Sequence, residues 1–191
     1  KKTEIEIINF VKILKKNNKN IILPTYNMFF PENKKTNFSN DNITTGYINK
    51  ILIKKFKFTR TSKPMYNYSI IGPDKKNILN CKQSTAWGED SVIKYLIDRE
   101  TIGVGINIES SNFNWMVIHH LEEKYKVPYR FFKIFKGYNT DLKKKVFEKM
   151  YVRKLKPKTI ESHTLVRNMK KNGHIKEKTY KDINFSFINL N

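Results

Sequence analysis

The sequence contains very little cysteine and no long apolar run. Its 191 residues include one cysteine, Cys81, which excludes an internal disulfide framework and a zinc site built from several thiolates. No apolar stretch reaches the ~18 residues that a membrane-spanning helix needs, and no secretory signal is recognisable. We therefore predict a cytoplasmic protein with no membrane partner, in which Cys81 is a small buried side chain.

Several catalytic loop motifs are absent as well. The sequence has no GxSxG, which excludes the common nucleophile elbow of serine hydrolases, and no GxxxxGK[ST] phosphate loop. The GVG of Gly103 to Gly105 is not a GxGxxG dinucleotide loop. The HHLEE segment fits neither HExxH nor HxxEH, and His163 and His174 lie far from it in the sequence, so we expect no metal site.

Arginine is scarce although the chain is strongly basic. The net charge is +21, from 38 basic and 17 acidic residues, but only 5 of the basic residues are arginines. Base and phosphate recognition favours the planar guanidinium group. The lysines also accompany 22 asparagines and many isoleucines, a bias expected from an AT-rich coding sequence. A dedicated nucleic-acid-binding protein is therefore an alternative rather than the first interpretation.

The apolar pattern predicts one mixed α/β domain over residues 1–191, with a central mixed sheet flanked by helices. Helices are predicted at Glu4 to Lys16, from Thr44 or Thr45 through Leu52, from Ser91 through Leu96, from the caps at 110–114 through Tyr125, at Asp141 to Tyr151, and from Pro157 to Gly173. Strands are predicted at Ile21 to Leu23, Tyr66 to Ile71, Ile102 to Ile108, Tyr129 to Phe135, Val152 to Leu155 and Ile183 to Leu190.

Two histidines beside two glutamates on one predicted helix are the main catalytic candidates. Residues three apart share a side of a helix, so His119 can pair with Glu122, and His120 with Glu123. A helical wheel groups four residues on the core side and does not choose between the pairs: Val117, Ile118, Leu121 and Tyr125. A carboxylate beside an imidazole suits the ring to removing a proton from a nucleophile. A solvated polar face explains the same spacing.

Three loops are further candidates. Thr25 to Phe30 follows a predicted strand at its carboxyl end, where ligands of α/β sheets bind. Arg60 to Pro64, RTSKP, offers cations and hydroxyls to a phosphate, or is an ordinary basic turn. Lys82 to Asp90 is a loop in which we expect Trp87 to be exposed.

Taken in order, these segments resemble the aminoglycoside 3-N-acetyltransferase family. The segments are ILPTYNMFF, RTSKP leading into IIGPD, STAWGEDS, the GVG strand and HHLEE. In the family the corresponding stretches are similar to LVMPTYT, RSLHPTHSVAALGP, FGxGSP, LLGVG and LHxAE. The order agrees up to about Lys126. The resemblance implies an antibiotic-acetyltransferase fold, distinct from the GNAT fold, over a single acyltransferase-like domain.

The resemblance also implies an activity and a set of site residues. It implies transfer of an acetyl group from acetyl-CoA to a primary amine of an amino sugar, without a metal. Aligned with LHxAE, His120 would be the general base and Glu123 would orient or support it. The remaining residues would bind the two substrates: Arg60, Thr61 and Ser62 on the CoA side, and Thr25, Tyr26, Trp87 and Ser91 on the acceptor side.

Some positions depart from the family pattern. His119 stands where the family has leucine, which leaves it as an alternative base, and Lys63 replaces a histidine. Because acidic residues are few, a neutral or anionic amino sugar, such as a nucleotide-linked one used in glycan synthesis, fits the charge better than a polycationic aminoglycoside. The family has segments before Lys1 and after Asn191, so we expect a fragment lacking one or both chain ends.

Two other interpretations stay open. The first is nucleic-acid binding through the lysines between Asp141 and Lys181, namely Lys143 to Lys145, Lys154, Lys156, Lys158, Lys170 and Lys171. The second is a degenerate family member without activity. The sequence does not fix the oligomeric state, and a homodimer is retained as one arrangement.

Overall fold

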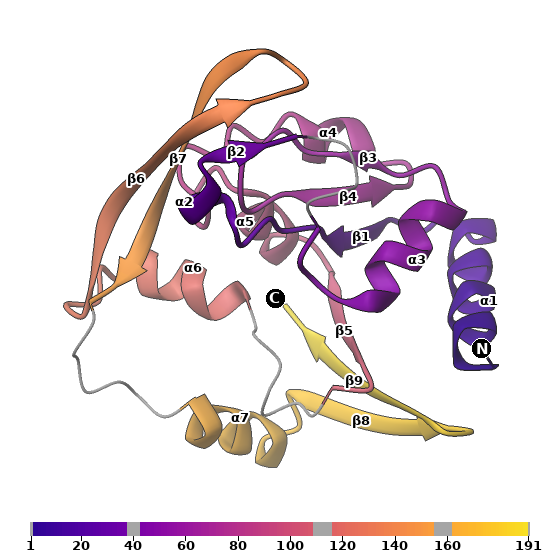
Figure 1. Cartoon of the computed structure of the whole chain (residues 1–191). Helices are drawn as coiled ribbons and strands as arrows, with labels where there is room; N and C mark the ends of the chain where they lie inside the picture. The colour runs from indigo at the N-terminus through magenta and orange to yellow at the C-terminus, as the bar shows by residue number, and fades with distance from the viewer. Residues whose placement is uncertain (1, 38–42, 109–115, 155–161, 191) are drawn as a thin grey trace. The chain divides into compact units, whose positions relative to one another are not determined.

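The computed structural model describes residues 2–37, 43–108, 116–154 and 162–190 (Figure 1). The helices are α1 (Lys2–Lys16), α2 (Phe30–Asn33), α3 (Tyr47–Lys55), α4 (Lys75–Leu79), α5 (Val92–Ile97), α6 (Met116–Lys124) and α7 (Ser162–Lys171). The strands are β1 (Ile21–Pro24), β2 (Lys35–Thr36), β3 (Thr59–Arg60), β4 (Tyr68–Ile71), β5 (Ile102–Ile106), β6 (Arg130–Asn139), β7 (Lys144–Arg153), β8 (Ile175–Tyr180) and β9 (Ile183–Asn189).

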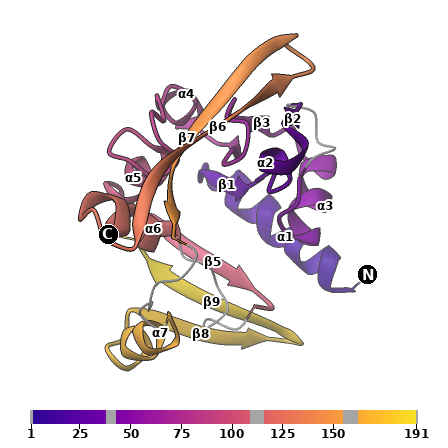
Figure 2. The same cartoon turned by 60° about the vertical axis from the view of Figure 1, so that its left-hand side comes forward.

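The mixed α/β class is confirmed, and the described strands are distributed over three small sheets. Their orders are β1-β4-β3, β2-β6-β7 and β5-β9-β8. The first and third sheets are antiparallel, whereas β2 runs parallel to β6. The third sheet is seen clearly in Figure 2, with β9 between β5 and β8.

The chain divides into two compact units. The first contains residues 1–86 and 132–150, and the second contains residues 87–131 and 151–191. Strands β6 and β7 contribute residues to both units.

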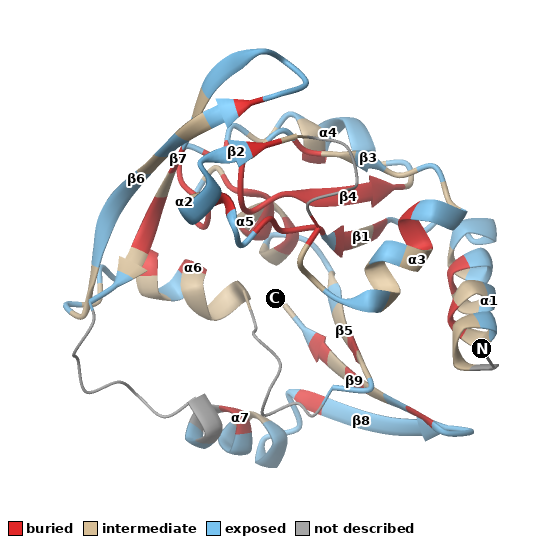
Figure 3. Ribbon diagram, in the orientation of Figure 1, coloured by how far each residue is buried: buried red, intermediate tan, exposed pale blue. Residues whose placement is uncertain are grey.

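The core of the first unit lies around β4. All four residues of β4 are buried between the neighbouring strands β1 and β3 (Figure 3). Helix α1 packs against β1 and buries Ile7 and Val11, which lie one turn apart on the same side of the helix. The predicted helix at 4–16 and the predicted strands at 21–23 and 66–71 are therefore present, with small shifts of their ends.

The second unit contains α5, α6, α7 and the β5-β9-β8 sheet. Val166, Ile175 and Ile188 form a small buried core between α7 and this sheet. Ser91 caps α5 as predicted, because its hydroxyl accepts a hydrogen bond from the backbone N–H of Lys94 at 3.2 Å. In strand β5 only Gly105 is buried, and Ile102 has 64% of its surface exposed.

One predicted helix and one predicted helix cap are wrong. Residues 141–151 were predicted to form a helix, but 144–153 form β7. Val146 and Met150 have a spacing that also suits a helix, whereas Glu148 and Met150 face inward from a strand. Thr44 and Thr45 do not cap α3, because their hydroxyls accept hydrogen bonds from the backbone N–H groups of Met28 and Tyr26.

Three other predictions concern segments that are only partly described. The helix caps predicted at 110–114, the helix start at Pro157 and the strand end at Leu155 lie outside the described residues. Helices α6 and α7 are described from Met116 and Ser162 onward. Strand β8 was not predicted, because IKEKTY buries only Ile175 and has no apolar alternation.

Candidate functional site

Helix α6 is held in the second unit by contacts on two sides. It packs against α5, and Val117 and Ile118 pack against the core formed by Val166, Ile175 and Ile188. The apolar residues at the start of α6 therefore anchor the helix, as the helical wheel predicted for Val117 and Ile118.

The other half of the predicted core side is wrong. Leu121 is 45% exposed and Tyr125 is 73% exposed, whereas His120 is 2% exposed and Glu123 is 9% exposed. A wheel assigns apolar residues to the core by default, but a polar side chain can face inward when a hydrogen bond satisfies it. The segment that precedes α5 supplies such a hydrogen bond to His120.

The imidazole of His120 is fixed by a backbone carbonyl. Its Nδ1 lies 2.7 Å from the carbonyl oxygen of Trp87. A carbonyl only accepts hydrogen bonds, so Nδ1 carries the proton and donates it. In the neutral ring, Nε2 then holds a lone pair. His120 is thus prepared, by tautomer and by orientation, to accept a proton at Nε2.

A carboxylate lies near Nε2 of His120. Oε1 of Glu89 is 3.9 Å from Nε2, and the Glu89 side chain is 63% exposed. Glu89 also lies 4.0 Å from Nζ of Lys94 on α5. The side of the ring that carries the lone pair therefore faces an exposed negative charge, which attracts cationic groups such as ammonium ions.

Trp87 is buried, and the prediction that it is exposed is wrong. It is 2% exposed, and its ring lies 4.8 Å from the ring of His119 at an interplanar angle of 43°. Its neighbours in sequence are polar and small, which suggested a solvent-facing loop. Trp87 instead contacts both histidines, His120 through its carbonyl and His119 through its ring.

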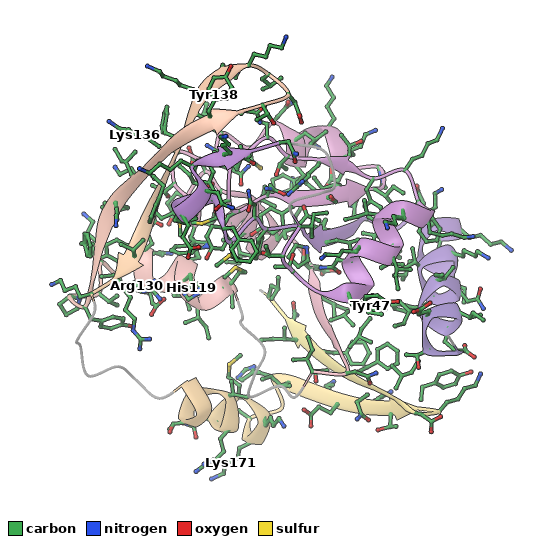
Figure 4. The ribbon with its side chains drawn as sticks, viewed as in Figure 1. Tyr47, His119, Arg130, Lys136, Tyr138 and Lys171 are labelled. Atoms are coloured by element: carbon green, nitrogen blue, oxygen red, sulfur yellow. The ribbon has the colours of Figure 1, made fainter. Side chains whose placement is uncertain are left out.

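His119 belongs to a network of charged groups that joins α6 to β6. Its Nδ1 lies 2.7 Å from Oε2 of Glu122, and the guanidinium of Arg130 lies 2.8 Å from the same oxygen. The hydroxyl of Tyr129 donates to Oε1 of Glu122 at 2.8 Å. Figure 4 shows His119 and Arg130 side by side. Arg130 also donates to the backbone carbonyl of Tyr151 at 2.9 Å.

This network lowers the pKa of Glu122. Burial alone would raise the pKa of this carboxyl, but hydrogen bonds from His119 and Tyr129 and the charge of Arg130 outweigh burial and lower it. The carboxylate of Glu122 is thus an ionised acceptor that three side chains share. His119 and Glu122 lie on α6, and Glu122 contacts Arg130 on β6 and Tyr129 just before it. This imidazole and carboxylate therefore help to hold α6 against β6.

A polar cluster in the first unit surrounds Thr25 and Asn67, both of which are fully buried. The hydroxyl of Thr25 donates to Oδ1 of Asn67 at 2.9 Å. The guanidinium of Arg60 donates to the same Oδ1 and to the backbone carbonyl of Thr25. Burial lowers the pKa of Arg60 to about 10, although the charge of Asp141 acts in the opposite direction.

The other predicted residues of the first unit differ in exposure. Thr61 is 2% exposed, and its hydroxyl accepts from the backbone N–H of Tyr68 at 2.9 Å. Tyr26 is buried, and its hydroxyl donates to that of Tyr68 at 3.2 Å. Burial raises the pKa of both tyrosines. Ser62 is exposed and lines an open cleft.

Glu148 on β7 is a buried carboxyl that the sequence analysis did not identify. It is 2% exposed and accepts hydrogen bonds from the backbone N–H groups of Met65 at 2.6 Å and Tyr66 at 3.1 Å. Burial raises its pKa to about 7, although those hydrogen bonds and the charge of Lys63 act in the opposite direction. Glu148 thereby fixes the segment that follows RTSKP.

The predicted site residues form two groups, one in each unit. The first unit holds Thr25, Tyr26, Arg60, Thr61 and Ser62, of which Thr25 and Arg60 are directly bonded. The second unit holds Trp87, Ser91, His120 and Glu123, of which Trp87 and His120 are directly bonded. Asn67, Glu89, Arg130 and Glu148 were missed, because only the folded chain brings them to these partners.

The described lysines of the alternative nucleic-acid surface also fall into two groups. Lys143, Lys144 and Lys145 belong to the first unit, and Lys154, Lys170 and Lys171 belong to the second. Lys156 and Lys158 lie outside the described residues. Residues 144–153 form β7 rather than a helix, so Lys144 and Lys145 lie on a strand.

No three histidine, cysteine or acidic side chains in the described segments are grouped so that they could hold a metal ion. Within the same segments, no helix has the length and the apolar character needed to cross a membrane.

Comparison with known proteins gives matches among solved structures. The YokD protein from Bacillus subtilis has a TM-score of 0.66 at 17% identity, over 90% of this chain and 70% of its own. Apo aminoglycoside acetyltransferase AAC(3)-IVa has a TM-score of 0.68 at 13% identity, over 90% and 64% of the two chains. AAC-IIIb, solved as a binary complex with CoASH, has a TM-score of 0.62 at 13% identity, over 78% and 57%.

The sequence comparisons gave no match: neither a protein-family model nor a curated protein is similar to the chain. The chain spans between 57% and 70% of the length of the three solved structures above. At these identities the likeness concerns the fold. The chain has the fold of the aminoglycoside acetyltransferases, as its order of motifs predicted.

Proposed function

We propose that this chain belongs to a CoA-dependent N-acyltransferase that moves an acetyl group from acetyl-CoA to a primary amine of an amino sugar. The observation that carries the proposal is the fixed imidazole of His120, with Nδ1 bonded to the Trp87 carbonyl and Nε2 left as the proton acceptor. The fold supports it, because similar structures include a complex of AAC-IIIb with CoASH and a complex of AAC-VIa with sisomicin.

In the proposed reaction, His120 is the general base. An ammonium ion has no lone pair, so it must lose a proton before its nitrogen can attack the thioester. As the N–C bond forms and the C–S bond breaks, the amine proton passes to Nε2 of His120. The CoA sulfur leaves as a thiolate, accepts that proton from Nε2 of His120 and becomes a thiol. The proton that the ammonium ion loses before the attack goes to solvent, so the products are the amide, the CoA thiol and one solvent proton. Atoms and charges then balance without a metal or an oxidant.

Two carboxylates are assigned supporting roles. Glu89, 3.9 Å from Nε2, attracts the incoming ammonium to the correct side of the ring. Glu123 is buried on α6 three residues after His120, which suits a role in positioning that helix turn. In the first unit, Arg60, Thr61 and Ser62 are proposed to lie on the CoA side, and Thr25 and Tyr26 to border the acceptor. In the second unit, Trp87 and Ser91 are proposed to bind the acceptor.

The acceptor is proposed to be a neutral or anionic amino sugar, for example one linked to a nucleotide. The support is charge: 17 acidic residues accompany 38 basic ones, and a polycationic aminoglycoside needs several carboxylates around it. Efficient acetylation of apramycin or sisomicin, with no turnover of a uridine-diphosphate hexosamine, would overturn this choice while leaving the acetyltransferase proposal in place.

The test uses the purified natural protein. Acetyl-CoA should raise its melting temperature, because a ligand that binds only the native state stabilises that state. Amines should then be screened for release of the CoA thiol and for N-acetylated product by mass spectrometry, with His120→Asn as the control. No stabilisation by acetyl-CoA, together with steeply salt-dependent binding of DNA or RNA, would replace this proposal with nucleic-acid binding.

A further inference from the structure

The first unit contains an open cleft of about 320 Å³ beside the RTSKP segment. Its lining comes from three stretches of chain: Ser62 to Pro64, the end of α4 and the segment after it (Leu79, Cys81, Lys82 and Gln83), and the start of β7 with the residue two before it (Leu142 and Lys144 to Phe147). All three stretches belong to the same unit. The cleft is therefore defined within one compact part of the molecule.

The lining of this cleft is strongly cationic. It includes Lys63, Lys82, Lys144 and Lys145, and no aspartate or glutamate is among its lining residues. Glu148 interacts with Lys63, but its oxygens accept hydrogen bonds from the backbone N–H groups of Met65 and Tyr66. Four lysines converging on one concave surface repel each other, and an anion relieves this repulsion.

The lining also contains polar groups suited to a ligand. Ser62 is exposed at the cleft. The Gln83 side chain is 4% exposed, and its Oε1 is buried without a hydrogen-bond partner among the described residues. A buried amide oxygen without a donor costs free energy, which a hydroxyl or amino group of a ligand would recover.

One side of the cleft is apolar. Pro64, Leu79, Val146 and Phe147 belong to its lining, and Phe147 has 64% of its surface exposed. Phosphate alone would use only the lysines. A nucleotide uses all three kinds of surface, because it carries phosphates, hydroxyl or amino donors, and a flat ring that packs on apolar and aromatic side chains.

We propose that this cleft binds the diphosphate group of a nucleotide through Lys63, Lys82, Lys144 and Lys145, with Gln83 accepting a hydrogen bond from the same ligand. Two sources supply this chemistry: CoA, and a nucleotide-linked amino sugar. The inference rests on the proposed function only for the choice between these sources. Arg60 and Thr61 are not required, because Arg60 donates to Asn67 and Thr61 accepts from the N–H of Tyr68.

The test is a calorimetric titration of the full natural chain with ADP and with inorganic pyrophosphate at 0.15 M salt, where charges more than ~8 Å apart are largely screened. We expect both probes to bind, ADP more tightly. Lys144→Gln and Lys63→Gln should each weaken ADP binding about tenfold, as for loss of a charged hydrogen bond. Gln83→Asn should weaken the binding of ADP but not that of pyrophosphate. Asparagine is a suitable replacement because it tolerates the left-handed backbone conformation of residue 83, where φ is 50°.

The matched control is Lys136→Gln. Lys136 is an exposed lysine on β6 and is not part of the cleft lining (Figure 4). Lys136→Gln should change the affinity for ADP by less than about twofold, because solvent and salt screen a single exposed charge outside the cleft. If Lys136→Gln weakens ADP as much as Lys144→Gln does, or if neither probe binds the unaltered chain, the proposed site is wrong.

Competition then identifies the source of the diphosphate. Displacement of ADP by CoA assigns the cleft to the acyl donor, and displacement by a uridine-diphosphate hexosamine assigns it to the acceptor. The site and the proposed function fail separately. If ADP binding depends on the lysines but no acetyl transfer is found, the site is retained and the proposed function is rejected. If acetyl transfer occurs and neither Lys63→Gln nor Lys144→Gln affects it, the proposed function is retained and the site is rejected.

Discussion

His119 and His120 are neighbours on α6, yet their side chains have different partners. His119 shares Glu122 with Arg130 and Tyr129 and packs against Trp87. His120 bonds to one neutral carbonyl, and its second nitrogen faces an exposed carboxylate 3.9 Å away. The pair that looks more like a catalytic dyad is thus the one that joins α6 to β6. A carboxylate next to an imidazole therefore does not by itself identify a general base.

Two buried carboxyls, Glu122 and Glu148, show a similar contrast. Charged and polar side chains surround Glu122 and lower its pKa, whereas Glu148 meets mainly backbone N–H groups, and burial raises its pKa to about 7. Glu122 therefore binds its partners as a charged carboxylate. Glu148 loses solvation when it ionises, which disfavours its charged form. Four substitutions test these contrasts, and they follow from the largest expected effect to the smallest.

His120→Asn should lower kcat by about 10²–10⁴-fold, which is the usual contribution of a general base. The Asn amide can still donate to the Trp87 carbonyl, but it has no nitrogen that accepts a proton. The free energy of unfolding should therefore change by no more than about 1 kcal/mol. Steady-state acetylation and urea unfolding measure the two effects. An active His120→Asn variant would assign the base to another residue.

Glu148→Gln should change the pH dependence of stability. The pKa of Glu148 is higher in the folded chain, about 7 against an ordinary 4.5, so its contribution to stability is fully present below about pH 4.5 and is lost as the pH rises through about 7. Each pKa unit corresponds to about 1.4 kcal/mol, which limits the loss to about 3 kcal/mol. Urea unfolding at pH 5 and pH 8 should show a steeper decline for the natural chain than for Glu148→Gln. Parallel declines would contradict this.

Glu122→Gln should destabilise the chain by about 1–3 kcal/mol at pH 7, because it leaves Arg130 half-buried without its charged partner. Since the pKa of Glu122 is lowered in the folded chain, this contribution is present above pH ~4.5 and is lost as the pH falls through the folded pKa. Residual acetylation by the folded variant should stay within about tenfold of the natural rate. A complete loss of turnover in a folded Glu122→Gln variant would make His119 and Glu122 the catalytic pair.

Glu89→Gln should have the smallest effect, a decrease of kcat/KM by about threefold. Its carboxylate is 3.9 Å from Nε2 of His120 and 63% exposed, so solvent screens its attraction for an ammonium ion. The decrease should diminish as salt is raised, which initial-rate measurements at two ionic strengths can detect. A large decrease that is independent of salt would show that Glu89 takes part in the proton transfer itself.

The sequence predicted much of the fold through local signals. The apolar spacing of α1, the Ser91 cap and the order of motifs were sufficient for the mixed α/β class. The errors arose where tertiary contacts override such signals. The apolar residues between 141 and 151 have a spacing that suits either a helix or a strand. Glu148 faces inward because it accepts hydrogen bonds from the backbone N–H groups of Met65 and Tyr66, and these partners cannot be recognised in the sequence.

The family pattern names His120 as a candidate, but it does not name the partner of its side chain. That partner is the backbone carbonyl of Trp87, which any residue at that position would offer. Sequence patterns record side chains, so a backbone acceptor gives no signal. Trp87 itself was expected in solvent because its neighbours are small and polar, and its burial follows from contacts with His119.

The most direct measurement is single-turnover acetylation by His119→Asn and His120→Asn, compared at saturating acetyl-CoA with an amine that the natural chain accepts. In each variant the amide replaces the Nδ1 donor, so the two differ only in which ring loses its proton-accepting nitrogen. We predict that His120→Asn loses about 10²-fold or more of the rate, whereas His119→Asn stays within about tenfold. The reverse order, or equal losses, would contradict the assignment of His120 as the base.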